Sequence, residues 1–220
     1  MPQSSAATTL RVKAGGNAND TAAGSGAREI TLVGLDENFE EVTETLATAG
    51  ASASSSTTTT FTRLYRFYVS ASGSYATVST GSLVGSHASN IVIENSAGTQ
   101  DWGTIDVTNY AKSQSEVGWY TIPAGKTGYV RLSEVTIDSG KTVDILFMHR
   151  GNADATAAPY DAMRTLSVSV GVNGGSIEKF TALEVPYGPF IGPHDIGFLA
   201  KVSSGTATVS VDFEIFVLDE

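Results

Sequence analysis

The C-terminal segment of the chain alternates between apolar and polar residues. Over Thr206–Glu220, with the sequence TATVSVDFEIFVLDE, apolar side chains occupy every second position from Val209 to Val217. A period of two is typical of a β-strand that buries one of its faces. Phe216 and Leu218 interrupt the polar face near the end of the segment. We therefore expect that end of the strand to be covered.

The same alternation, with many Val, Ile, Thr, Tyr and Phe residues, predicts strands along most of the chain. We expect further strands over Arg28–Leu35, Phe39–Leu46, Phe61–Val69, Ser89–Glu94, Val117–Ile122, Tyr129–Ile137, Thr142–Arg150, Thr165–Val172, Glu178–Val185 and Ile196–Val202. No segment has a sustained helical period, and Asp154–Met163 is expected to be a loop with at most one helical turn. The pattern predicts an all-β fold, namely an antiparallel two-sheet β-sandwich that is jelly-roll-like and carries an N-terminal arm.

Turn residues separate the expected strands. Leu35–Asn38 is expected to close a hairpin, and Pro123–Lys126 supplies the Pro and Gly of another tight turn between neighbouring strands. The segment Val185–Phe198, VPYGPFIGPHDIGF, contains prolines that cannot donate to a central hydrogen-bond ladder. We expect it to be an ordered crossing rather than a strand.

Two segments differ in composition from the expected strands. Residues 1–27 are small and polar, and we expect an N-terminal arm or an edge strand around Leu10–Val12. Residues 28–220 are expected to form a single β-sandwich domain. Within it, residues 47–60, ATAGASASSSTTTT, are of low complexity and contain no large side chain that could fill a core. This segment is expected to be a solvated linker or to lie extended against a neighbour.

Charge and cysteine content narrow the function classes. The chain has 13 Lys and Arg against 23 Asp and Glu, a net charge of −10, and only 16% charged residues, well below the roughly 25% usual for soluble domains. A nucleic-acid binder needs a basic face, which this composition does not provide. The absence of cysteine excludes disulfides and thiol chemistry. Apolar runs are too short for a membrane helix, and the N-terminus does not resemble a signal peptide.

Catalytic and cofactor motifs are not apparent in the sequence. Gly125-Lys126-Thr127 resembles part of a phosphate loop, but Tyr120 stands where that motif requires glycine. His87, His149 and His194 lack metal-ligand spacing. Adjacent carboxylates point to opposite faces of a strand, so they do not form a glycosidase pair. We expect a protein that is not an enzyme and that has no cofactor and no metal.

Candidate interface residues are aromatic or large and apolar. In the proline-rich segment they are Tyr187, Phe190 and Ile191, which would be costly to leave in water if they point outward. A loop that folds back on its own core is the equal alternative. Trp102 and Trp119 are the remaining candidates, either as interface anchors or, with Tyr120, as platforms for a sugar ring.

Four segments together resemble a known group of proteins: GLDENFEEVTETL at Gly34–Leu46, RLYRFYV at Arg63–Val69, WYTIPAGKTGYV at Trp119–Val130, and PHDIGFLAKVSSGTATVSVDFEIFVL at Pro193–Leu218. The chain resembles small virion structural proteins of tailed, especially marine, bacteriophages. The similar motifs are turn and strand patterns, and no catalytic residue is carried over with them.

The resemblance implies a virion protein that assembles in the cytoplasm of the host. We expect a capsid decoration or cement protein on the head surface, with a tail or fibre-attachment component and a carbohydrate-binding β-sandwich module as alternatives. Its expected partners are other virion proteins, such as the major capsid protein or tail and connector components. We also expect a homo-oligomer, with a trimer favoured by analogy to other virion jelly rolls, and neither nucleic-acid nor membrane binding.

Overall fold

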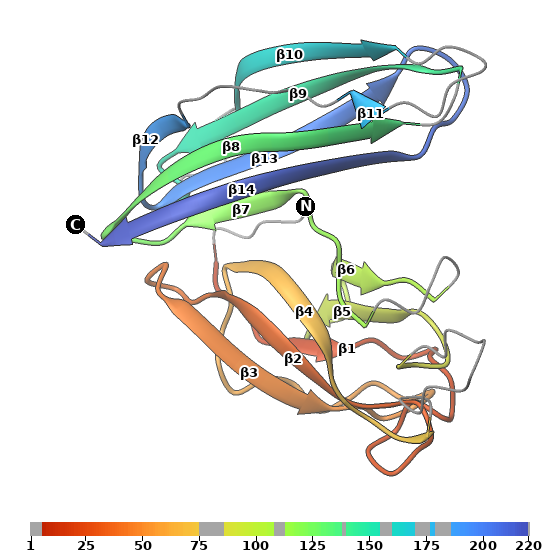
Figure 1. The fold of residues 1–220 in the computed structure, drawn as a ribbon. Helices are drawn as coiled ribbons and strands as arrows, with labels where there is room; N and C mark the ends of the chain where they lie inside the picture. The colour runs from red at the N-terminus through yellow and green to blue at the C-terminus, as the bar shows by residue number, and fades with distance from the viewer. Residues whose placement is uncertain are drawn as a thin grey trace. The chain divides into compact units, whose positions relative to one another are not determined.

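The computed structural model describes residues 6–74, 86–107, 113–137, 140–154, 160–169, 177–178 and 186–219. In this part of the chain the regular elements are all β-strands, and every pair of neighbouring strands is antiparallel (Figure 1). The all-β prediction is therefore confirmed. The chain divides into two compact units, Met1–Val117 and Gly118–Glu220.

The first unit contains two three-stranded sheets, with the strand orders β1-β5-β6 and β3-β2-β4. Its strands are β1 (Leu10–Val12), β2 (Ala27–Leu35), β3 (Glu41–Ala47), β4 (Arg63–Ser72), β5 (Ile91–Asn95) and β6 (Asp101–Ile105). The expected hairpin joins β2 to β3. In its turn the Asp36 carboxylate accepts hydrogen bonds from the amides of Asn38 and Glu40, at 2.8 and 3.0 Å.

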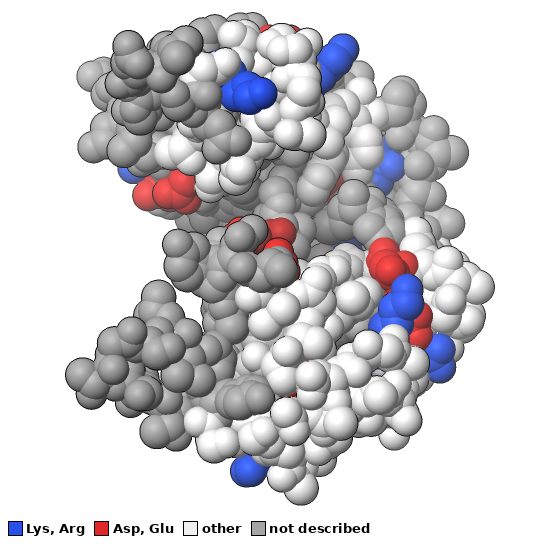
Figure 2. Space-filling model, turned by 90° about the vertical axis from the view of Figure 1, so that its right-hand side faces the viewer, with Lys and Arg blue, Asp and Glu red and all other residues white. Residues whose placement is uncertain are grey.

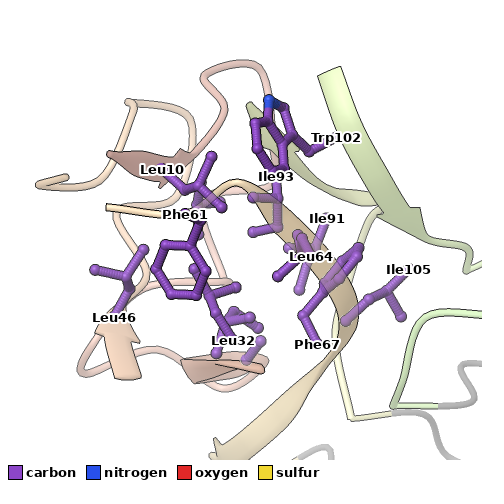
Figure 3. Close-up of a cluster of buried hydrophobic side chains, with 13 residues drawn as sticks. Leu10, Leu32, Leu46, Phe61, Leu64, Phe67, Ile91, Ile93, Trp102 and Ile105 are labelled. Carbon is purple, nitrogen blue, oxygen red and sulfur yellow. The ribbon is translucent and has the colours of Figure 1, made fainter. Parts of the chain in front are cut away.

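One hydrophobic core lies between these two sheets. Ile93 and Ile105 from one sheet belong to the same buried cluster as Leu32 and Phe67 from the other (Figure 3). The sheets approach closely at Gly103, where an added Cβ would lie 2.7 Å from the Phe67 ring. A side chain larger than hydrogen at this position would therefore push the sheets apart.

The second unit contains two four-stranded sheets. Its strands are β7 (Trp119–Ile122), β8 (Lys126–Ile137), β9 (Thr142–Gly151), β10 (Asp161–Ser169), β11 (Ile177–Glu178), β12 (Tyr187–Ile191), β13 (His194–Val202) and β14 (Val209–Asp219). One sheet has the order β10-β9-β13-β7. In the other, β8 is central, with β14 along one side and β11 and β12 sharing the opposite side. Buried residues of both sheets, such as Val130 and Ile196, form its core.

The structure divides the chain differently from our expectation of one domain over 28–220. Residues before position 28 belong to the first unit, where Leu10 is fully buried and β1 forms the edge strand that was one of our two expectations for residues 1–27. The boundary after Val117 was not apparent, because strands of both units have the same alternating pattern. Such a pattern shows which side chains share a face but not which strands share a core.

Two further sequence expectations are corrected. The proline-rich segment contains strand β12, which pairs with β8 in a register that is interrupted between Tyr187 and Phe190, where Pro189 lies. β12 is at the side of its sheet, and there a proline is compatible with a strand. The Pro123–Lys126 turn does not form a hairpin, because β7 and β8 belong to different sheets.

The low-complexity segment is held by hydrogen bonds along the outer side of β1. The amide of Leu10 donates to the Thr57 hydroxyl and that of Val12 to the Ser54 hydroxyl, both at 2.9 Å. The carbonyls of the same two β1 residues accept from the amides of Thr57 and Ser54, at 2.7 and 3.1 Å. Ser54 and Thr57 are buried. Short hydroxyl side chains thus close a sheet edge, which the prediction of a solvated linker did not anticipate.

We predict that Thr57→Val lowers the free energy of unfolding of the first unit by about 1–3 kcal/mol, because the Leu10 amide loses a buried acceptor. Ser56→Ala is the matched control, since Ser56 is exposed, and it should change stability by less than about 0.5 kcal/mol. Urea unfolding followed by Trp102 fluorescence in a Trp119→Phe background measures both. Equal effects of the two substitutions would show that the hydroxyl of Thr57 does not stabilise this edge.

Candidate interaction surface of the second unit

A row of polar side chains crosses the β7-β13-β9 part of the second unit. Asp195 on β13 lies directly between Thr121 on β7 and Arg150 on β9. The Thr121 hydroxyl donates to Asp195 Oδ1 at 2.6 Å. Arg150 donates to Asp195 Oδ2 through Nε at 3.1 Å and also through Nη2. Asp195 is fully buried and Arg150 nearly so. Both Arg150 nitrogens donate to the same carboxylate oxygen, and these charge-assisted hydrogen bonds hold the ion pair at a fixed point of the sheet.

Aromatic rings pack on this ion pair. The Tyr160 ring centre lies 4.4 Å from Arg150 Cζ, a cation–π contact. Trp119 packs edge-on against Tyr160, with ring centres 4.9 Å apart. The Trp119 indole also lies against Gly197, where an added Cβ would be 2.2 Å from the ring. These contacts fix Trp119 in place and indicate a structural role for the row, in which the charges stabilise the sheet.

A histidine pair lies at the end of the core of this unit. His149 Nδ1 and His194 Nε2 are 3.0 Å apart, and the ring planes differ by 17°. Both rings contact Phe190, with ring centres 5.7 and 5.0 Å away. One nitrogen must donate and the other accept, so this hydrogen bond requires at least one neutral ring. In the part of the chain that the structure describes, no group of three His, Cys, Asp or Glu side chains could hold a metal ion.

Large apolar side chains are exposed at one end of the sheet formed by β12, β8 and β14. Ile191 is 63% exposed, Leu218 54% and Phe216 45%. Ile191 and Leu218 both pair with Thr127 of β8, one from each side, and therefore share a face of the sheet. Phe216 is two residues before Leu218 and lies on the same face. We call Ile191, Phe216 and Leu218 the apolar patch.

The surface of the described residues is poor in charge. Figure 2 shows one face of the molecule, on which charged side chains form a few small groups separated by uncharged surface. Next to the apolar patch, Arg131 pairs with Glu214 at 2.9 Å and Lys126 pairs with Asp219. These pairs neutralise Glu214 and Asp219 of β14. A partner surface therefore meets apolar and internally neutralised groups here rather than an uncompensated charge.

The structure places the five candidate interface residues in different environments. Ile191 is exposed, Tyr187 and Trp119 are half-buried, and Phe190 and Trp102 are buried, at 4% and 3% exposure. Phe190 is therefore a core residue of the second unit and not an interface residue, because it faces inward where its neighbour faces outward. Trp102 belongs to the core of the first unit. The structure thus brings none of the other four candidates together with Ile191 on an exposed surface.

The exposed residues of β14 were identified only indirectly by the sequence. Phe216 and Leu218 interrupted the polar face of an alternating strand, which indicated a covered end but not what covers it. The Arg150–Asp195 pair was missed altogether, because 45 residues separate its members and neither stands in a recognisable motif. Only the strand register brings the two charges together.

Comparisons with known proteins give no identification: no protein-family model, no curated protein and no solved structure matches the chain. Among the described residues there is no helix long and apolar enough to cross a bilayer.

We predict that Arg150→Met lowers the free energy of unfolding of the second unit by about 3–5 kcal/mol, because the Asp195 charge is left buried without its partner. Arg131→Met is the matched control. It removes a half-exposed ion pair and should cost less than about 1 kcal/mol. Urea unfolding followed by Trp119 fluorescence in a Trp102→Phe background separates the two. Similar losses in both variants would contradict the assignment of Arg150 as the counter-charge of a buried carboxylate.

Acid should destabilise the second unit through His194. Burial lowers the pKa of His194 below its ordinary value of 6.5, the neighbouring His149 lowers it further, and Asp195 opposes both. The unfolded chain therefore binds more protons below about pH 6.5, and stability falls as the pH falls through that value. We predict that His194→Gln reduces this slope between about pH 7 and pH 5.

The measurement is the melting temperature of the Trp119 signal across this pH range. His87→Gln is the control, because burial also lowers the pKa of His87 but that residue belongs to the first unit. It should reduce the pH dependence of the Trp102 signal and leave that of Trp119 unchanged. An unaltered Trp119 slope in His194→Gln would mean that another group causes the acid sensitivity.

Proposed function

We propose that the chain is a non-enzymatic structural protein of a bacteriophage virion, a decoration or cement protein on the head surface. The motif resemblance described above supports this role, as does a β fold with few surface charges. The observation that carries the proposal is the apolar patch, because large apolar side chains grouped on one sheet face mark an interaction site. A decoration protein must bind its particle through such a surface, since a stable interface buries apolar area at its centre.

The proposal includes a two-sheet sandwich for each unit. In both units the core draws residues from both sheets. In the second unit the described strands form two four-stranded sheets, as in a jelly roll. Virion proteins use this architecture to present a rigid surface to neighbours, and the buried ion pair and its aromatic cover would give the second unit such rigidity.

The carbohydrate-binding alternative has less support. Trp102 is buried in a core, Tyr120 packs against the core of the second unit, and Trp119 is held edge-on to Tyr160. A sugar-binding platform requires an open aromatic face, which the buried Trp102 does not offer. A tail or fibre-attachment component would use the same apolar patch and is an outcome of the test.

The test is the addition of purified protein to particles of the encoding phage that lack it. We expect decoration of heads, seen as density in electron cryomicroscopy, and at least roughly tenfold weaker binding of Ile191→Asp, since burial of such a side chain is worth about 1.5–3 kcal/mol. Leu199→Asp is the control, because Leu199 is 44% exposed on the other sheet.

Binding to tails alone would show that the protein is a tail component and not a head decoration protein. No binding to any part of the particle would overturn the virion role. Binding that Ile191→Asp and Leu199→Asp reduce equally would show that the apolar patch is not the contact surface.

A further inference from the structure

We propose that β14 pairs with β14 of a second copy, antiparallel and about a two-fold axis, so that the free chain forms a dimer. The inference concerns the protein by itself and goes beyond the virion role. It starts from the edge of a sheet. β14 spans Val209–Asp219 and pairs with β8 along its whole length. In the part of the chain that the structure describes, no strand pairs with its other side. A long open edge presents unpaired backbone groups to another strand.

Three other described strands at the side of a sheet, β1, β4 and β12, are closed or interrupted. Ser54 and Thr57 cover β1, as described above. Along β4, the Val69 amide donates to the Ser113 carbonyl at 2.7 Å and the Ser115 amide to that of Phe67 at 2.8 Å. β12 contains Pro189 at a break in its register. β14 has no proline, and its register shift with β8 places the extra residue, Ser133, on β8. The edge of β14 is therefore regular as well as open.

Side chains of β14 on both faces remain incompletely covered. On the core side, Phe213 and Ile215 pack against the core but are only half-buried. On the other side, Phe216 and Leu218 are exposed. An added strand would extend the core over the first pair and shield the second. It would also explain why the sequence pattern of this strand predicts a covered end.

The charges of β14 favour a second copy and select a register. Glu214 is neutralised by Arg131, and Asp219 by Lys126. In a two-fold antiparallel pair, one residue lies opposite its own copy, and we call the register centred on that residue. Registers centred on Asp212, Phe213 or Glu214 place acids directly opposite acids, which is unfavourable. A register centred on Ile215 avoids this and pairs residues 211–219 of both copies. A register centred on Phe216 pairs only the shorter stretch 213–219.

The register centred on Ile215 is self-complementary. On the core side, Ile215 faces itself, and Phe213 faces Val217 of the second copy. On the other side, Phe216 faces Glu214 of the second copy, and Leu218 faces Asp212. Each contact occurs twice, as in an isologous two-fold interface. The pairing joins two four-stranded sheets into one continuous sheet and leaves neither copy of β14 with an open edge.

The first experiment measures self-association of the full chain by sedimentation equilibrium. We expect a monomer–dimer equilibrium, weakened at least tenfold by Phe216→Asp, which places a second acid opposite Glu214 of the partner copy. Phe216→Lys removes the same ring but places a cation there, so it should weaken the dimer less. Leu199→Asp should have no effect. A chain that is monomeric at all concentrations, or a trimer, would overturn the proposal, as would equal effects of Phe216→Asp and Leu199→Asp.

The second experiment tests the register and does not require disruptive variants. The chain contains no cysteine, so one introduced thiol reports on its own surroundings. Ile215→Cys should form a disulfide-linked dimer under mild oxidation, because directly opposite Cα atoms lie about 4.5–5.5 Å apart in an antiparallel pair. Leu218→Cys is the control, since its two copies lie far apart in this register. Faster cross-linking of Leu218→Cys would overturn the proposed pairing.

The two experiments use free protein without phage particles. A dimer that fails to bind particles would contradict the virion role alone. A decorating monomer would contradict the dimer alone.

Discussion

The need to satisfy backbone hydrogen bonds at the sides of sheets governs how this chain is built. Each unit consists of antiparallel sheets of only three or four strands. A large share of the strands therefore lies at the edge of a sheet. A chain with 16% charged residues has few charges with which to protect those edges. In the first unit it uses serine and threonine instead. Ser54 and Thr57 satisfy the β1 amides with their hydroxyls and pair with β1 through their own backbone, so a segment without large side chains acts as the missing strand.

The few charges that are buried are paired by strand register. Asp195 accepts hydrogen bonds from Thr121 and Arg150, which lie directly beside it on the two neighbouring strands. Because all three positions are fixed by the same ladder, the ion pair cannot relax without breaking the sheet. Tyr160 packs on the Arg150 guanidinium, and Trp119 packs edge-on against Tyr160. The pair thus fixes the register of β13 between β7 and β9 as well as compensating its own charges.

The sequence predicted the positions of strands well where apolar and polar residues alternate regularly. It did not predict which strands pair with one another. The expected strand Thr142–Arg150 agrees with β9, Thr142–Gly151, to within one residue. Alternation of apolar and polar residues follows directly from burial of one face of a strand. Pro123–Lys126 was read as a hairpin turn, yet it connects two sheets, since turn chemistry does not reveal the partner of a strand. Phe190 and Ile191 are neighbours with opposite environments, so composition alone could not separate core from surface. The exposed position of Phe216 was apparent only as an interruption of a pattern.

The central claim is that the chain closes the β1 edge with its own residues and leaves the β14 edge for a second copy. Residue-resolved amide hydrogen exchange at two protein concentrations tests it most directly. We predict slow exchange of the Leu10 and Val12 amides at both concentrations. Alternate amides of β14 should exchange rapidly in dilute protein and slowly in concentrated protein, because only a second copy covers them. Slow, concentration-independent exchange along all of β14 would contradict the account, since it would show that the chain covers this edge itself.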